Sequence, residues 1–273
     1  MKILFSLPFI FASILGAPNI PIALRKSQSI DGRIVGGEPV TIEQFPIVGG
    51  EPVTIEQFPY QVSAQFFGTH WCGGVIISDR YVISAAHCFE WPTWFYSIRA
   101  GATLHHTGGQ VIEIEEYYNH PDFDPAKRNF DISVLLLTSS LIFGPSVATI
   151  PLPVQGEYLP EGTQAFVSGW GALYEGGPFP EQLHAVSVPI VSNERCNIFY
   201  NVIGWTITET MICAGYDEGG RDACNMDSGG PLTANGKLVG IVSWGAGCAQ
   251  PNFPGVYANV ANLRSFITEI SGI

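Results

Sequence analysis

The segment Asp222–Leu232, DACNMDSGGPL, places two acids, a cysteine, a serine and two glycines in one short run of turn-forming composition. Such a run is typical of a loop that carries a nucleophile. A serine hydroxyl is a weak nucleophile at neutral pH, so it needs a base within hydrogen-bond range and N–H donors directed at the oxyanion that it creates. We predict that Ser228 is the nucleophile. Met226, two residues before it, is the unusual residue of the loop.

The chain around this loop has the composition of a β protein with many turns. Of its 273 residues, 46% are hydrophobic and 13% are charged, which allows a proper core and excludes a disordered chain. The 31 glycines and 20 prolines favour short strands joined by turns over long helices.

Short β-rich runs recur between turn signals along the chain. These runs are residues 74–78, 81–85, 111–115, 131–137, 186–191 and 238–244. Asn235-Gly236 is a strong signal for a two-residue hairpin turn. Only the end of the chain has apolar residues at helical spacing, namely Val260, Leu263, Phe266, Ile267 and Ile270. The sequence therefore predicts an all-β fold closed by one C-terminal helix.

The first 33 residues have the pattern of an exported precursor. Residues 1–16 contain Lys2, an apolar run and then small residues, which is typical of a signal peptide. That run is too short to span a bilayer, and no later run reaches the roughly 18 apolar residues of a transmembrane helix. Residues 17–33 hold three of the 12 cations and end at Arg33, as a removable propeptide would. We expect a secreted, extracellular protein.

The charge and the cysteine content limit the classes of binding partner and the cellular compartment that we expect. The net charge is −12, and residues 34–273 keep 8 basic and 23 acidic residues, a net charge of −15. Such a surface repels nucleic acid and anionic membranes, so we expect neither as a partner. The six cysteines of an exported chain indicate disulfides, although their spacing alone leaves fifteen pairings open.

Two further residues can complete a catalytic set with Ser228. His87 ends a strand-like run in SAAHC (residues 84–88), and Asp131 heads the apolar run DISVLLL. Alone, His87 is more simply explained as a packed or surface histidine, and Asp131 fits a strand-end cap as well as a catalytic acid. A carboxylate at the head of an apolar strand does, however, need hydrogen-bond partners to stay ionised.

Taken in order, AAHC, DISVLLL and DSGGPL resemble the trypsin-like (chymotrypsin-family) serine proteases, and the resemblance covers about residues 34–273. The runs VSGWG (167–171) and SWG (243–245) match as well. The α/β-hydrolases are excluded because their order is Ser, Asp, His and because Met226 breaks their G-x-S-x-G motif. The resemblance implies two antiparallel β-barrels packed across a cleft, at about residues 47–155 and 156–258, and a helix at about 259–270.

The resemblance also assigns the catalytic roles. It implies that Ser228 attacks, that His87 is the general base, and that Asp131 orients the imidazole. The backbone N–H groups of Met226 and Ser228 would form the oxyanion hole. The segment that pairs with the substrate backbone would be Ser243, Trp244 and Gly245.

Substrate preference follows from the same resemblance. Asp222 matches the acid at the base of the primary specificity pocket, which implies cleavage of polypeptides after Arg or Lys. Gly245 and Gly255 match the pocket walls and leave room for a long side chain. Ala223 stands where a serine is common, so one hydroxyl partner for a lysine ammonium is missing. We predict a preference for Arg over Lys.

The remaining implications concern assembly and cross-links. The resemblance pairs Cys72 with Cys88, Cys196 with Cys213, and Cys224 with Cys248. It implies no cofactor, and we assign no metal, because the region 99–116 lacks a recognisable calcium loop. We expect a monomer that protein protease inhibitors could bind.

Activation is complicated by a repeat. In this family a cut before I-V-G-G frees an ammonium that pairs with the acid preceding the serine, here Asp227. Arg33-Ile34 is the junction with a basic residue before it, but IVGGEPVTIEQFP at 34–46 recurs unchanged at 47–59. Ile47 has the family's usual distance to the following strand, yet Pro46 precedes it. Both Ile34 and Ile47 remain candidates for the mature N-terminus.

Met226 leaves a second interpretation of the protein's function open. The family has glycine there, in a backbone conformation that usually needs positive φ, so a side chain would add about 1 to 3 kcal/mol of strain. The alternative to an active protease is a catalytically impaired homologue that acts as a secreted binding or regulatory protein.

Overall fold

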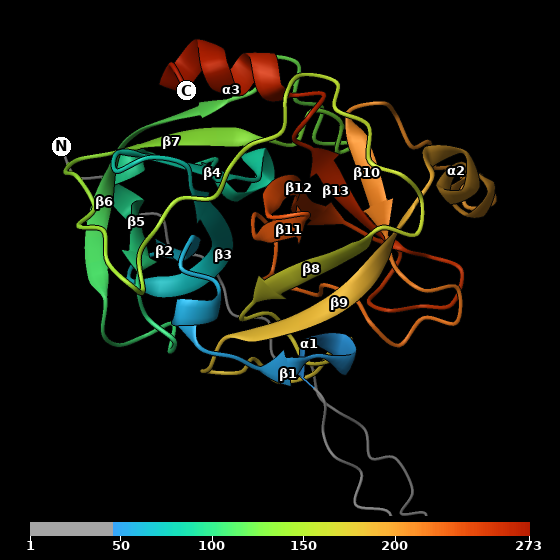
Figure 1. Cartoon of the computed structure of the whole chain (residues 1–273), viewed down its shortest axis with the longest axis horizontal. Coiled ribbons are helices and arrows are strands. Elements are labelled where there is room, and N and C mark those ends of the chain that lie inside the picture. The colour runs from blue at the N-terminus through green and yellow to red at the C-terminus, as the bar shows by residue number, and fades with distance from the viewer. Residues whose placement is uncertain (1–45) are drawn as a thin grey trace, which may run out of the picture. The chain divides into compact units, whose positions relative to one another are not determined.

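The computed structural model of the chain describes residues 46–273 (Figure 1). The signal peptide, the propeptide, Arg33 and Ile34 lie outside the described residues. Most of the regular structure between residues 46 and 273 is antiparallel sheet, and it forms two barrels.

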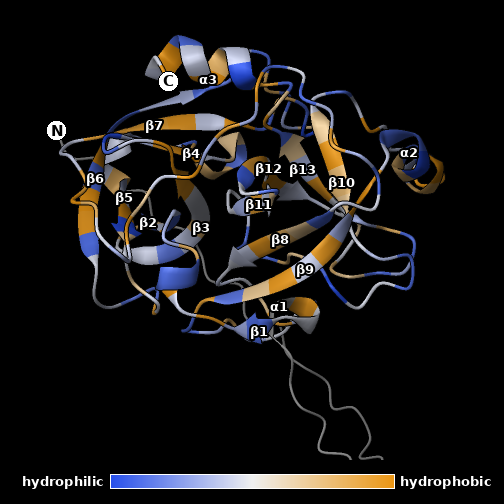
Figure 2. Cartoon of the chain, in the orientation of Figure 1, coloured by the Kyte–Doolittle hydropathy of each residue, from blue (hydrophilic) through white to orange (hydrophobic). Residues whose placement is uncertain are grey.

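The first barrel closes from six antiparallel strands in the order β2-β3-β4-β7-β6-β5. The strands are β2 (Gln61–Phe66), β3 (Thr69–Ile76), β4 (Tyr81–Ser84), β5 (Tyr96–Ala100), β6 (Gln110–Asn119) and β7 (Ser133–Leu137). Strand β5 alternates buried and half-buried residues, whereas β2, β4 and β7 are buried along most of their length. The hydrophobic colour of β6 and β7 is visible in Figure 2. Val62, Val75, Ile83, Ile98 and Leu135 are fully buried in this core.

The second barrel has six strands in the order β9-β10-β13-β12-β11-β8 and closes through β8–β9 pairing. The strands are β8 (Gln164–Gly169), β9 (His184–Val191), β10 (Met211–Ala214), β11 (Pro231–Ala234), β12 (Lys237–Trp244) and β13 (Gly255–Asn259). The expected hairpin joins β11 to β12, with Asn235 and Gly236 at φ of 52° and 71°. The predicted all-β fold of two antiparallel barrels is confirmed.

The helices agree with the prediction only in part. Helix α3 (Arg264–Ser271) is the expected C-terminal helix and packs against the first barrel's core. It begins later than residue 259 because the Asn259 side chain accepts hydrogen bonds from the N–H groups of Ala261 and Asn262 and forms a turn. Two other helices were not predicted. One is the four-residue α1 (Pro46–Gly49), and the other is α2 (Asn193–Asn201), whose mostly polar sequence lacks an apolar helical period.

Among the described residues, three 3₁₀ turns complete the regular structure, at Ile55–Gln57, Ala86–Cys88 and Thr93–Phe95. In residues 46–273 no helix is long and apolar enough to cross a membrane.

The second copy of the repeat is built into the second barrel. It contains β1 (Glu51–Pro52), which pairs with the start of β9. Ile55 is 2% exposed and packs with Trp170 and Leu183. The carbonyl of Val48 accepts a hydrogen bond from the N–H of Asp222, so this copy also contacts the nucleophile loop.

Candidate active site

Strand pairing in the first barrel brings His87 and Asp131 together. His87 lies in the 3₁₀ turn after β4, Asp131 lies just before β7, and these two strands pair through Ser84 and Ser133. His87 Nδ1 lies 2.7 Å from Asp131 Oδ2, and the His87 backbone N–H donates to Oδ1 over 2.9 Å. The Ser243 hydroxyl also donates to Oδ2. The buried carboxylate therefore has the partners that the sequence analysis required of it.

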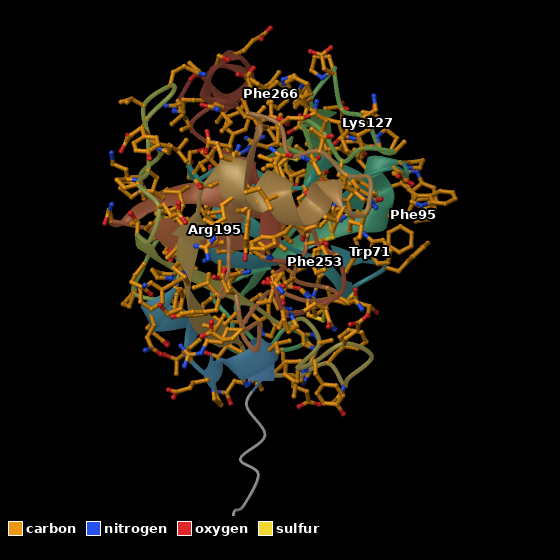
Figure 3. The ribbon with its side chains drawn as sticks, turned by 90° about the vertical axis from the view of Figure 1, so that its right-hand side faces the viewer. Trp71, Phe95, Lys127, Arg195, Phe253 and Phe266 are labelled. Atoms are coloured by element: carbon orange, nitrogen blue, oxygen red, sulfur yellow. A yellow bond between two sulfur atoms is a disulfide. The ribbon has the colours of Figure 1, made fainter. Side chains whose placement is uncertain are left out.

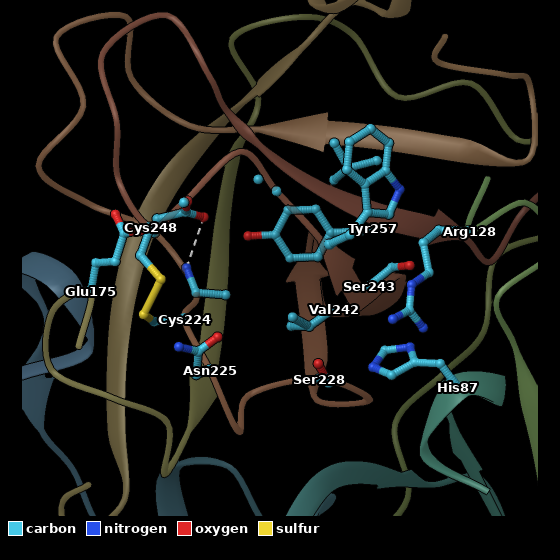
Figure 4. A pocket seen from close by; sticks show the side chains of 17 residues that line it. His87, Arg128, Glu175, Cys224, Asn225, Ser228, Val242, Ser243, Cys248 and Tyr257 are labelled. Carbon is cyan, nitrogen blue, oxygen red and sulfur yellow. Dashed lines mark hydrogen bonds between the residues drawn. A yellow bond between two sulfur atoms is a disulfide. The ribbon is translucent and has the colours of Figure 1, made fainter. Parts of the chain in front are cut away.

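Ser228 is held between the two barrels. Its carbonyl accepts a hydrogen bond from Gly73 N–H on β3 over 2.7 Å, and the N–H of Gly229 donates to Val242 on β12 over 2.8 Å. Gly229 has φ of 81°, and a Cβ there would lie 2.2 Å from Ser84 Oγ, so only glycine fits this turn. The result is that Ser228 and His87 lie side by side at one cavity (Figure 4).

The loop before Ser228 presents unpaired backbone donors. Within residues 46–273 the N–H groups of Met226 and Ser228 donate no hydrogen bond, so both are free to stabilise an oxyanion. Met226 has φ of 77°, the left-handed conformation that favours glycine.

A buried histidine forms a hydrogen bond with this loop. His70 Nε2 lies 3.1 Å from the carbonyl oxygen of Met226, and Nδ1 lies 2.8 Å from the Ser63 hydroxyl. Burial, with the nearby His105, lowers the pKa of His70 to about 4, so the ring is neutral. Nε2–H then donates to the carbonyl, and Nδ1 accepts from Ser63. The sequence analysis missed His70; its position on the inward side of an alternating strand was the available signal.

Asp222 is the buried acid in the lining of the cavity, whose volume is about 290 Å³. The carboxylate is 3% exposed and accepts hydrogen bonds from the N–H groups of Ala223 (2.8 Å) and Ala249 (3.0 Å). Burial raises its pKa to about 7, despite these two hydrogen bonds. A Cβ at Gly255 would lie 2.4 Å from this carboxylate, so the glycine keeps that space open. The cavity can thus accept a long side chain that ends in a cation.

Two further groups line this cavity that the sequence analysis did not name. The Tyr257 hydroxyl is buried near Asp222 and has no hydrogen-bond partner in the described residues. Arg128 lies beside His87 at the opposite end, with φ of 53° (Figure 4). The expected substrate-binding residues Ala223, Ser243, Trp244 and Gly245 line the cavity between these ends.

Asp227 lies in the interior behind the same loop. It is fully buried and accepts hydrogen bonds from the N–H groups of Gly171 (2.7 Å) and Cys224 (2.9 Å). A Cβ on Gly169 or Gly171 would lie 2.2 to 2.3 Å from a carboxylate oxygen, which explains the two glycines of VSGWG. Burial raises the pKa of Asp227 to about 7. The site is therefore suited to receive a cation.

The cysteines form three disulfides in the same pairs that the resemblance implied: Cys72–Cys88, Cys196–Cys213 and Cys224–Cys248. The described residues contain one cluster of potential metal ligands, Cys72, His87 and Cys88. Both of its sulfur atoms are bonded in the first disulfide, so they cannot act as thiolate ligands. Three disulfides fit an oxidising compartment.

Comparison with known proteins agrees with this geometry. A family model described as Trypsin matches residues 47–267. The chain belongs to the trypsin family. It is 42% identical to Trypsin 5G1 of Aedes aegypti over 252 residues, covering 92% of this chain and 88% of the relative. It is 43% identical to the vitellin-degrading protease of Bombyx mori over 240 residues, covering 88% and 86%.

A third relative, Trypsin of Simulium vittatum, is 44% identical over 234 residues, which cover 84% of this chain and 89% of the relative. The chain is thus a trypsin-like serine endopeptidase of a family that acts on polypeptides. The family match begins at Ile47, the first residue of the second repeat copy. That copy is also the one built into the second barrel.

Proposed function

We propose that this chain is a secreted serine endopeptidase, made as a zymogen, that cleaves polypeptides after Arg or Lys. The observation that carries the proposal is that the buried acid Asp222 lines the same cavity as Ser228 and His87. A buried carboxylate with only backbone partners favours a cationic guest, and Gly245 and Gly255 in the cavity lining leave room for a long side chain.

In the proposed mechanism Ser228 Oγ attacks the carbonyl carbon after the Arg or Lys, and His87 takes the serine proton. Asp131 holds Nδ1–H, which directs Nε2 toward the serine and stabilises the imidazolium that forms. The N–H groups of Met226 and Ser228 stabilise the oxyanion. His87 then protonates the leaving amine, and water releases the acyl group by the same steps in reverse order.

Zymogen activation would use Asp227. A buried carboxylate without a cation is strongly destabilising, and a freed N-terminal ammonium can remove that cost and fix the loop from Cys224 to Ser228. Cleavage at Arg33-Ile34 supplies such an ammonium. The second repeat copy occupies the place beside the nucleophile loop, so Ile47 stays a candidate for the mature terminus. N-terminal sequencing of the active form decides between Ile34 and Ile47.

A peptide library varied at P1, the residue before the scissile bond, tests the proposal before and after cleavage at Arg33. We expect cleavage after Arg and Lys only in the processed form. A serine-directed fluorophosphonate should label the processed wild type but not Ser228→Ala. A folded, processed protein that neither cleaves the library nor reacts with the probe would instead support the non-catalytic homologue, which the comparisons do not favour.

The partners proposed are polypeptide substrates and protein protease inhibitors that enter the same cavity. The acidic chain argues against nucleic acid and anionic membranes. The enzyme would act as a monomer because each barrel contributes part of one complete site.

A further inference from the structure

An exposed group of aromatic side chains lies on the first barrel, outside the site described above. We define the aromatic patch as Phe66, Phe67, Trp71, Trp91, Trp94 and Phe95. Trp94 is 72% exposed, Phe67 67%, Trp91 58% and Trp71 44%. Three of the chain's six tryptophans are therefore in this patch and open to solvent. An exposed apolar cluster of this size on a soluble protein indicates a binding surface.

The patch is a contiguous surface and not a set of scattered residues. Phe66 lies at its centre, with its ring 4.8 Å from Phe67, 5.9 Å from Trp71 and 5.5 Å from Phe95. Phe95 extends the patch to Trp94 and to Trp91. Figure 3 shows Trp71 and Phe95 together at one edge of the molecule.

One end of the patch reaches the catalytic residues. The indole N–H of Trp71 donates to the carbonyl of Cys88 over 3.0 Å, and Cys88 directly follows His87. Cys88 is also cross-linked to Cys72, the residue after Trp71. Trp71 therefore has a fixed position next to the general base.

The patch lies on the side of Ser228 from which the leaving half of a substrate departs. The Ser228–Gly229 segment is flanked by β12 on one side, through Val242, and by β3 on the other, through Gly73. The acyl half of the substrate occupies the β12 side, where Asp222 and Ser243 line the cavity. A chain that passes over Ser228 then continues across β3, where Trp71 begins the patch.

We propose that the aromatic patch binds apolar side chains of the substrate polypeptide at the second to fourth residues after the scissile bond. This inference rests on the proposed function, because it needs a substrate that enters at Asp222. Continuity with the cleft favours a polypeptide as the occupant over a carbohydrate or lipid surface. Contact between an aromatic pair changes binding by roughly two- to tenfold, and this is the gain expected for each well-placed apolar residue.

Two quenched peptides test the inference. Both have the same residues up to an arginine and the same residue after it, and they differ only at the next three positions, Leu-Phe-Leu in one and Ser-Gly-Ser in the other. We expect the processed enzyme to have a higher kcat/KM for the apolar peptide, by roughly four- to hundredfold for two contacts, through a lower KM. A peptidyl-arginine coumarin amide, which has no residue after the arginine, serves as the reference substrate.

Variants then locate the contact. Trp94→Ser and Phe67→Ser change the two most exposed members of the patch and should preserve the fold. Each should lower the apolar-to-polar ratio by roughly two- to tenfold and leave the coumarin amide unaffected, and Trp94→Phe should restore most of the ratio. The matched control is Tyr158→Ser, which removes an aromatic residue that is 79% exposed and lies outside the patch.

The possible failures are distinguishable. No cleavage of any arginine substrate refutes the proposed function. Cleavage with equal kcat/KM for the two peptides, or an equal loss with the coumarin amide in the variants, refutes the aromatic patch as a substrate site. Binding to chitin beads or neutral lipid vesicles that Trp94→Ser abolishes, with peptide cleavage unchanged, overturns the inference in favour of a surface anchor.

Discussion

Asp222 and Asp227 belong to one loop and are chemically alike, but the spaces in front of them differ. Both are buried, each accepts hydrogen bonds from two backbone N–H groups, and burial raises the pKa of each to about 7. Asp222 faces an open cavity of about 290 Å³, whereas Asp227 fits between Gly169 and Gly171.

This difference shows that access decides what a buried carboxylate does. Burial raises the pKa of both residues to about 7, so proton affinity is not what distinguishes their surroundings. Asp222 lines a cavity that a cation from outside the molecule can enter, whereas Asp227 is 0% exposed and does not line that cavity. The same substitution at the two positions should therefore have two different effects.

The largest effect is expected from Asp222→Asn. Removing one partner of a buried charge pair should lower kcat/KM for arginine substrates by up to roughly 10⁴-fold. Cleavage after an apolar residue should not fall, because the catalytic residues and the oxyanion donors are untouched. Initial rates on P1 arginine and P1 phenylalanine peptides measure the change. An equal loss on both substrates would show that Asp222 supports the loop and does not select the cation.

Asp227→Asn should act on all substrates alike. Loss of the carboxylate removes the proposed partner of the new ammonium, so we expect kcat/KM to fall roughly 10²- to 10³-fold in the processed enzyme, whatever the P1 residue. A change in the ratio of arginine to phenylalanine cleavage would contradict the separation of the two sites.

In the uncleaved form, we expect Asp227→Asn to raise the free energy of unfolding instead of impairing the protein. Between the unfolded pKa near 3.8 and the folded value of about 7, the native Asp227 holds a proton that the unfolded chain has released. The stabilisation that the protonated Asp227 gives to the folded state is therefore fully present below pH 3.8 and is lost as the pH rises through 7. In a Ser228→Ala background, Asp227→Asn should stabilise the zymogen more at pH 8 than at pH 5 in urea melts. A difference that is constant with pH would contradict the raised pKa.

Met226→Gly tests the strain beside Asp227. Met226 has φ of 77°, and a non-glycine residue there adds about 1 to 3 kcal/mol. If this strain persists in the transition state, the glycine variant should have a kcat roughly ten- to hundredfold higher. If the loop relaxes instead, kcat will stay the same, and a protein inhibitor will bind the variant more tightly. Stopped-flow kinetics measures the first outcome and inhibitor titration the second. If both kcat and inhibitor affinity stay the same, the Met226 side chain does not have the proposed role.

The sequence predicted what local motifs encode and missed what the tertiary fold brings together. The residues Ser228, His87 and Asp131 stand in recognisable motifs, and the two barrels follow from the family resemblance. Helix α2 was missed because its polar surface leaves no apolar period. His70 and Arg128 were missed because the contact of each with the site crosses between segments far apart in the chain. The aromatic patch likewise joins residues 66–71 to 91–95 only in the folded barrel.

Ala223→Ser should have the smallest effect. It tests how the residue next to Asp222 sets the preference between Arg and Lys. Ala223 lines the cavity next to the carboxylate, and a serine there would add one hydroxyl to the lining. One added hydrogen bond to a charged group contributes about 1.5 to 3 kcal/mol at most, and the displaced water reduces this gain. An ammonium gains more from it than a guanidinium, because the longer arginine side chain already reaches Asp222 with two N–H groups.

We therefore expect the wild type to cleave after Arg faster than after Lys, and the variant to narrow that kcat/KM ratio by roughly two- to fivefold. Tyr158→Ser, a change at an exposed residue outside this cavity, is the control. A wild-type ratio at or below one would mean that the carboxylate alone sets the cation preference, whatever stands at residue 223.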